Sequence, residues 1–322
     1  MNTLRAIVLT LIIGGPLAAA TFNLDKTTTI IWSEKEDASQ VLTTPDSFTK
    51  QLSRFDRAVR LKRNDQISPE HFLKFVGQQA LDWTPSEIER FRDSLERIKP
   101  PLQSLKLSFP KKILLIKTSG KDEPAPYTRQ HAIILPEAVV RSPRKPDALL
   151  AHELFHILTR NAPAEFRSRL YKTIGFEPCN PIRLPGKLNE KRITNPDAPI
   201  YDHFIRVTRG GKITSVIPVL LTKSADYDPD ASAPFFSYLE QRFIEIENRM
   251  GRWQVRQLGT DAATWSFDEA EDFYPQIGGN RYSVFQPEEI LARHFTSLIM
   301  ATNLPDDSSV ASRLKNALSS RD

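Results

Sequence analysis

The pentapeptide His-Glu-Leu-Phe-His at residues 152–156 constrains this chain more than any other feature. Residues four apart on an α-helix share one face, with about 5–6 Å between their Cβ atoms, so His152 and His156 can direct both imidazoles toward one point. Two imidazoles at this spacing can bind one Zn²⁺, and Glu153 can address a water beside the metal. The pentapeptide therefore predicts a zinc site on a helix.

The residues around the pentapeptide predict that this helix is buried. Pro146-Asp147 is a typical helix start, and residues 148–158 are apolar nearly all round apart from the motif. Arg160-Asn161, with Pro163 beyond, predicts the end of the helix. Two imidazoles without partners inside an apolar helix would be costly, which favours a metal site over a purely structural role.

The rest of the chain predicts an α+β fold. Short apolar runs are typical of strands, and turns that contain glycine are typical of hairpins. Apolar residues at helical spacing are typical of amphipathic helices. The predicted elements are strands at 113–116 and 132–135, a proline-rich loop at 174–201, a hairpin formed by 203–207 and 213–221, a helix at 237–250 and a last helix from Pro287.

Residues 21–108 predict a helical N-terminal region, ahead of a second region at 109–322. Within the N-terminal region, the β-branched run Thr27–Trp32 predicts an edge strand. Thr84 and Glu87 have capping-box spacing, and we expect Pro100-Pro101 to end the helix that they begin. The predicted helices of this region span residues 45–61, 68–76 and 84–98.

Composition narrows the class of protein. In 322 residues, 40% hydrophobic and 26% charged side chains are ordinary for a globular protein. The net charge of +5 is small and basic residues alternate with acidic ones, which predicts a mixed solvated surface and no nucleic-acid partner. Cys179 is the single cysteine, so an intramolecular disulfide and a cysteine-based zinc site are both excluded.

The first twenty residues resemble an export signal. Arg5 precedes the apolar stretch 6–13, Gly15-Pro16 breaks it, and the small residues 18–20 predict cleavage after Ala20. No later segment approaches 18 uninterrupted apolar residues. We therefore expect an exported protein, periplasmic or extracellular, with no stable membrane insertion after the signal is removed.

Two histidines leave a catalytic zinc site incomplete, because such sites normally have three protein ligands. The extended motif HExxHxxGxxH would need glycine at 159 and histidine at 162, where the chain has Thr159 and Ala162. A glutamate on a second helix is the alternative, and Glu289 is the first candidate, with Glu288 as its rival nearer the apolar face. Other carboxylates lie in loops or on solvated faces: Glu165, Glu177, Glu240, Glu245 and Glu247.

Residues 132–161 and 280–299 resemble the gluzincins, the thermolysin-like superfamily of zinc metallopeptidases. In that superfamily the ligand glutamate is followed by a small residue three positions later and often by an aromatic residue six positions later. Glu289 has Ala292 and Phe295 at these offsets. The resemblance implies a zincin-like catalytic domain at 109–322, with a small, mostly antiparallel sheet and active-site helices, and Glu289 as the third zinc ligand.

One position departs from the superfamily pattern. Arg293 stands where such proteins often have an acid that hydrogen-bonds a zinc-binding histidine, so another carboxylate must orient the imidazole. The distance of 133 residues from His156 to Glu289 also implies a large insertion.

A complete site predicts hydrolysis of peptide bonds in a peptide or protein substrate. Zinc would activate a water, Glu153 would act as general base, and a further donor would stabilise the oxyanion. Tyr282 is the candidate donor, with Tyr201 and His203 as alternatives. Two other functions remain open: a zincin-like protein that binds metal and partners without turnover, and an amidase that acts on cell-wall peptides.

Overall fold

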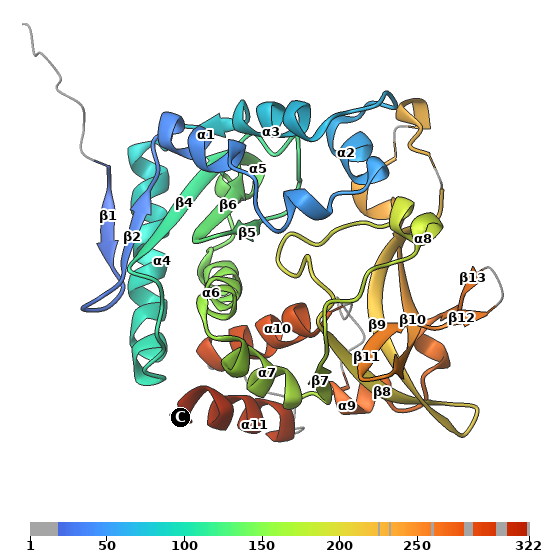
Figure 1. The fold of residues 1–322 in the computed structure, drawn as a ribbon. Coiled ribbons are helices and arrows are strands. Elements are labelled where there is room, and N and C mark those ends of the chain that lie inside the picture. Colours follow the sequence, from blue (N-terminus) through green and yellow to red (C-terminus); the bar gives the residue numbers. More distant parts are fainter. Residues whose placement is uncertain are drawn as a thin grey trace, which may run out of the picture.

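The computed structural model describes residues 19–224, 226–231, 233–258, 261–279, 286–300 and 308–320. Helices and two larger sheets give a mixed α+β fold, as the sequence predicts (Figure 1). Within these ranges no helix is long and apolar enough to cross a membrane. The helices are α1 (Lys35–Thr43), α2 (Arg54–Leu61), α3 (Pro69–Gly77), α4 (Pro85–Ser104), α5 (Glu137–Val140), α6 (Asp147–Asn161), α7 (Ala164–Lys172), α8 (Gly186–Glu190), α9 (Phe273–Gln276), α10 (Pro287–Ile299) and α11 (Ser308–Ser319).

The first sheet has the strand order β1-β2-β4-β6-β5, and β3 also pairs with β4. The β2–β4 and β4–β6 pairs are parallel, whereas the β1–β2, β3–β4 and β5–β6 pairs are antiparallel, so this sheet is mixed. Strand β2 lies between β1 and β4, so the prediction of an edge strand at Thr27–Trp32 is wrong. The strands are β1 (Thr21–Asn23), β2 (Thr29–Trp32), β3 (Ala80–Leu81), β4 (Lys112–Thr118), β5 (Tyr127–Arg129) and β6 (Ala132–Pro136).

Helices cover both faces of the first sheet. Successive side chains of a strand point to opposite faces, and in β6 Ile133 belongs to the core formed with α4 and α6, whereas Ile134 packs with α1 and α3. Burial on both faces explains why β4 and β6 are nearly continuous apolar runs.

The second sheet is antiparallel throughout, with the order β11-β10-β9-β8-β7 and β14 paired to β10. The predicted hairpin is confirmed as β8 and β9. The predicted helix at 237–250 is wrong, because β10 pairs along β9 and buries Phe243 and Ile244 on opposite faces. Pairing within a sheet outweighs local helix propensity here. The strands are β7 (Phe176–Pro178), β8 (His203–Arg209), β9 (Lys212–Thr222), β10 (Leu239–Arg249), β11 (Arg252–Val255) and β14 (Thr264–Trp265), and β12 (Gln257–Leu258) pairs separately with β13 (Asp261–Ala262).

The N-terminal region differs from a purely helical layer. Strands β1, β2 and β3 come from residues 21–108 and join the first sheet, which therefore crosses the predicted boundary at 108/109. The capping box of Thr84 and Glu87 is confirmed. Pro100 and Pro101 do not end α4, because the following turn is held by Leu102, which is 2% exposed. The prediction that the two prolines end this helix is therefore wrong.

Helix α6 lies near the middle of the molecule, between the two sheets, and α10 packs along it (Figure 1). Phe155 of α6 and Phe295 of α10 are fully buried, with ring centroids 5.2 Å apart. The predicted motif helix and the predicted helix beginning at Pro287 are both confirmed. Their contact brings the second helix to the side of α6 that carries the histidines.

Replacing Leu154 by alanine should lower the free energy of unfolding by about 2–5 kcal/mol, because this side chain of α6 is 0% exposed and its removal leaves a cavity. Urea denaturation measures the change. Met250→Ala is the control, since Met250 is fully exposed in a turn and its loss should change stability by less than about 0.5 kcal/mol. Equal midpoints for both variants would contradict a tightly packed α6.

Candidate metal centre

Helices α6 and α10 bring three potential metal ligands together. His152 and His156 project from α6, and Glu289 from the first turn of α10. The Nε2 atoms of His152 and His156 lie 3.4 Å and 3.8 Å from Oε2 of Glu289. A nitrogen or oxygen atom from each of the three lies within 4.8 Å of the others. Two imidazoles and one carboxylate are a ligand set of catalytic zinc, which leaves a fourth position for water.

Unpartnered polar atoms at the same point fit a metal ion and its water. Nε2 of His156 and Oε2 of Glu153 are buried and have no hydrogen-bond partner. His156 is 1% exposed and Glu153 is 3% exposed. A buried polar atom without a partner costs about 1–3 kcal/mol. A cation beside His156 and a water beside Glu153 would satisfy both atoms, so the residues present fit zinc.

Glu288 contacts the opposite nitrogen of His156. Its Oε1 lies 2.8 Å from Nδ1 of His156 and accepts a hydrogen bond from Thr159 Oγ1 at 2.5 Å. Its Oε2 accepts a hydrogen bond from the hydroxyl of Tyr171. A carboxylate on Nδ1 favours a proton there and leaves Nε2 as the metal-binding atom. Glu288 was the alternative to Glu289 as a ligand in the sequence analysis. Its contact with Nδ1 is the one that an acid at position 293 would otherwise make, where this chain has Arg293.

Glu289 is itself held in place by the proline-rich loop. Nδ2 of Asn195 donates hydrogen bonds to Oε1 of Glu289 and Oε1 of Gln286, both at 2.8 Å. Because Oε1 of Glu289 is engaged by Asn195, Oε2 is the oxygen that faces the two histidines. Sequence reasoning missed Asn195, for which the only signal was the length of the loop that contains it.

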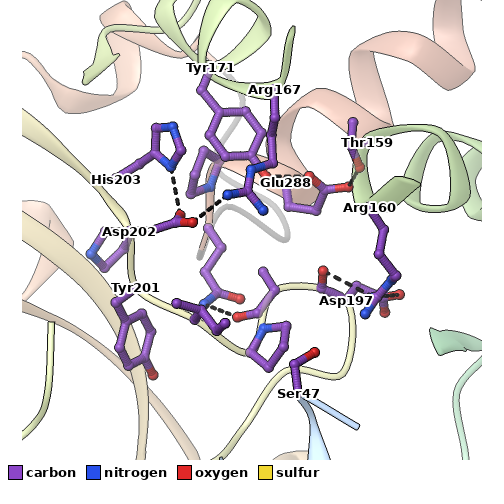
Figure 2. A pocket seen from close by; sticks show the side chains of 16 residues that line it. Ser47, Thr159, Arg160, Arg167, Tyr171, Asp197, Tyr201, Asp202, His203 and Glu288 are labelled. Carbon is purple, nitrogen blue, oxygen red and sulfur yellow. Dashed lines mark hydrogen bonds and ion pairs between the residues drawn. The ribbon is translucent and has the colours of Figure 1, made fainter. Parts of the chain in front are cut away.

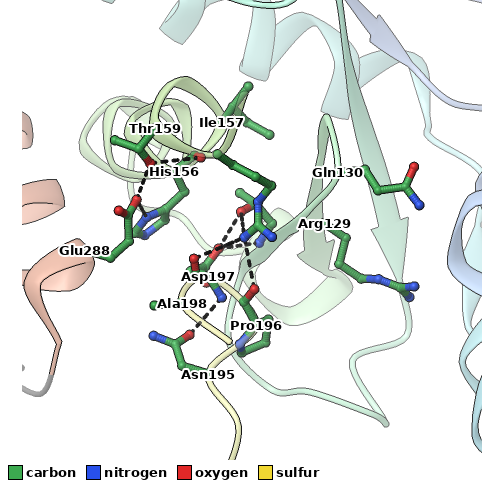
Figure 3. A network of polar contacts seen from close by, with 12 residues as sticks. Arg129, Gln130, His156, Ile157, Thr159, Asn195, Pro196, Asp197, Ala198 and Glu288 are labelled. Carbon is green, nitrogen blue, oxygen red and sulfur yellow. Dashed lines mark hydrogen bonds and ion pairs between the residues drawn. The ribbon is translucent and has the colours of Figure 1, made fainter. Parts of the chain in front are cut away.

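Asp197 is a second residue that sequence reasoning missed. One of its carboxylate oxygens lies within 4.8 Å of donor atoms of Glu153 and His156. Its side chain is 7% exposed and interacts with Arg160 of α6. Figure 3 shows Asp197 on the same loop as Asn195, near His156. The proline-rich loop, for which the sequence predicted no role in the centre, therefore brings a carboxylate to it.

Charges at the centre shift the ionisation of its members. Burial raises the pKa of Glu153 well above its ordinary value, and the charge of Asp197 adds to this effect. Burial would lower the pKa of His156, but the charges of Asp197 and Glu289 and the hydrogen bond with Glu288 raise it to about 10. Burial would raise the pKa of Glu289, but the charge of His156 lowers it to about 2. Such a cluster of carboxylates favours a cation at its centre.

An apolar cleft of about 310 Å³ borders the centre and reaches His152, Glu153 and Glu289. Its size falls in the range of ligand sites, about 300–1,000 Å³. The apolar part of its wall includes Pro126, Leu149, Ile193, Leu220, Phe235 and Leu239.

Of the three predicted oxyanion donors, the two that the structure describes, Tyr201 and His203, do not line this cleft. Tyr282 lies outside the described residues. Tyr201 and His203 line a separate cavity of about 200 Å³ on the Glu288 side (Figure 2). Nε2 of His203 lies 2.9 Å from Ser168 Oγ, and its Nδ1 lies 2.7 Å from Asp202 Oδ1, so both nitrogens are engaged.

The carboxylates set aside from the sequence do not join the centre. Among the residues that the structure describes, the potential metal ligands form two groups, which contain His152, Glu153, His156, Asp197 and Glu289. The carboxylates outside both groups include Glu165, Glu177, Glu240, Glu245 and Glu247.

Comparisons with protein-family models, with curated proteins and with solved structures find no match to this chain. The function must therefore be argued from the chemistry of the centre.

Proposed function

We propose that this protein is an exported zinc metallopeptidase of the gluzincin type, with a zincin-like catalytic domain. His152, His156 and Glu289 are the zinc ligands, and Glu153 is the general base. The signal-like residues 1–20 support export to the periplasm or the exterior.

One observation carries the proposal. The donors of His152, His156 and Glu289 lie within 4.8 Å of one another, and beside them the buried Glu153 has an oxygen without a partner. Three protein ligands and an adjacent free carboxylate are the arrangement that hydrolysis by an activated water requires. The neighbouring cleft offers space for a substrate at the same point.

Each residue then has a defined part in the chemistry. Zinc, when bound, lowers the pKa of a water and polarises the substrate carbonyl. Glu153 accepts a proton from the attacking water and returns it to the leaving amine. Glu288 orients His156 through Nδ1, and Asn195 orients Glu289 through Oε1.

Metal analysis joined to a cleavage assay tests the proposal. We expect about one zinc per purified chain, cleavage of a mixed peptide library, loss of cleavage after chelation and recovery when zinc is restored. Peptide fragments of cell walls belong in the same assay, because they separate a peptidase from an amidase. A protein without stoichiometric zinc, whose metal content is unchanged in His156→Ala, would contradict the proposal. Stoichiometric zinc without cleavage would indicate a metal-containing binding module.

A further inference from the structure

Asp197 occupies a fixed place beside the metal centre. Oδ1 of Asp197 accepts hydrogen bonds from the backbone N of Thr128 at 2.8 Å and from its Oγ1 at 2.5 Å. Nη2 of Arg160 lies 3.6 Å from the same oxygen. Among the described residues no hydrogen bond to Oδ2 is present. One oxygen therefore anchors the carboxylate, and the other remains available.

The loop around Asp197 is held on both sides. Before it, the backbone N of Thr194 donates to the buried carboxylate of Asp56 at 3.0 Å and 3.1 Å. After it, Nε2 of Gln286 donates to the carbonyl oxygen of Ala198 at 3.0 Å. Arg160 also donates to the carbonyl oxygen of Pro196 at 3.0 Å. Asp197 is therefore positioned before any substrate binds, which is the condition for effective electrostatic stabilisation.

Asp197 and Glu289 belong to different groups of potential metal ligands. Asp197 groups with Glu153 and His156, whereas the proposed zinc ligands His152, His156 and Glu289 form the other group. Zinc–ligand bonds of about 2.0–2.2 Å keep the ligands of one ion close together, and Asp197 does not group with His152 and Glu289. It shares this position with Glu153, whose buried Oε2 has no partner. Two carboxylates thus lie on the same side of His156.

We propose that Asp197 is a second catalytic residue, which accepts one hydrogen bond of the attacking water while Glu153 accepts the other. This inference rests on the proposed function. A water has two O–H groups, and two acceptors fix both its position and its orientation. Glu153 takes one proton when the oxygen attacks the carbonyl carbon. The second hydrogen stays covalently attached to the oxygen and forms a hydrogen bond with the carboxylate of Asp197. No proton passes to Asp197.

Asp197→Asn tests the role without a large change of shape. Its amide oxygen can still accept from Thr128, but the negative charge is removed. We expect zinc to remain stoichiometric, KM to change little and kcat to fall by about 10- to 100-fold. In the Co²⁺-substituted protein, azide should bind about 10-fold more tightly, measured from the visible absorption spectrum, because a repelling charge is lost.

Asp272→Asn is a matched control. Asp272 also accepts from a threonine backbone N and Oγ1, those of Thr208 at 2.7 Å and 3.1 Å, but lies outside both groups of potential ligands. It should leave kcat and azide affinity unchanged. Thr128→Val keeps the charge of Asp197 and removes one anchor, so it should lower kcat while azide affinity stays as in the wild type.

Separate results identify which proposal fails. Wild-type kcat in Asp197→Asn, or unchanged azide affinity, would overturn the role of Asp197 in a protein that binds zinc and depends on Glu153. Loss of zinc from Asp197→Asn would also overturn it, because Asp197 would then be a ligand. If the wild type binds no zinc, or if Glu153→Gln cleaves normally, the proposed function fails first.

Discussion

Glu153→Gln should lower kcat for peptide hydrolysis by about 100- to 10,000-fold, the usual contribution of a general acid–base residue. Glutamine has nearly the same shape but cannot accept the proton of the attacking water. Glu153 is 3% exposed and its Oε2 has no partner, so this oxygen is available to the attacking water. Initial rates with a cleaved peptide, together with the zinc content, measure the effect.

Glu165→Gln is the control for this prediction, because Glu165 is an exposed glutamate on α7, the next helix, and lies outside both groups of potential ligands. It should retain the wild-type rate. The zinc content of Glu153→Gln should also stay at the wild-type level, since Glu153 is not one of the three proposed zinc ligands. An active Glu153→Gln protein with zinc bound would show that another group is the base.

Local sequence patterns predicted the two helices that carry the proposed metal ligands. Helix α6 follows from its apolar residues, and α10 from Pro287 and the helical spacing after it. The spacing of His152 and His156 is fixed by the helix itself, so their partnership needed no tertiary information. The sequence pattern also made Glu289 the first candidate for a third ligand, but its position beside the two histidines depends on the packing of α10 against α6.

Features that depend on distant contacts could not be predicted in the same way. Strand β10 has glutamates and arginines that suit a helix, and only its pairing with β9 makes it a strand. The hydrogen bond that places Asp197 joins residues 69 apart in sequence. The loop from β7 to β8 lacks periodicity, so nothing local indicated which of its polar residues would reach the centre. Contacts between residues so far apart in the sequence depend on how the whole chain packs.

The two adjacent glutamates of α10 should affect zinc binding unequally, and this comparison tests the geometry of the centre most directly. Glu289→Gln should weaken zinc binding by more than about 100-fold, because a direct ligand contributes more than an orienting residue, whose loss costs about 10- to 100-fold. Glu288→Gln should fall in that lower range, since Glu288 contacts Nδ1 of His156 and not Nε2. The amide oxygen of the glutamine can still accept from Thr159, and its NH2 group can donate to the hydroxyl oxygen of Tyr171.

Competition with a chelator of known zinc affinity measures both dissociation constants, and each variant is the control for the other. The two side chains lie in the same turn of α10, and each substitution removes one carboxylate. A general effect of lost charge or of lower helix stability would therefore be the same for both variants. Their contacts differ: Oε2 of Glu289 lies 3.4 Å from Nε2 of His152, whereas Oε1 of Glu288 lies 2.8 Å from Nδ1 of His156. A larger loss in Glu288→Gln would therefore assign the ligand role to Glu288 and reverse the orientation of the imidazole inferred for His156.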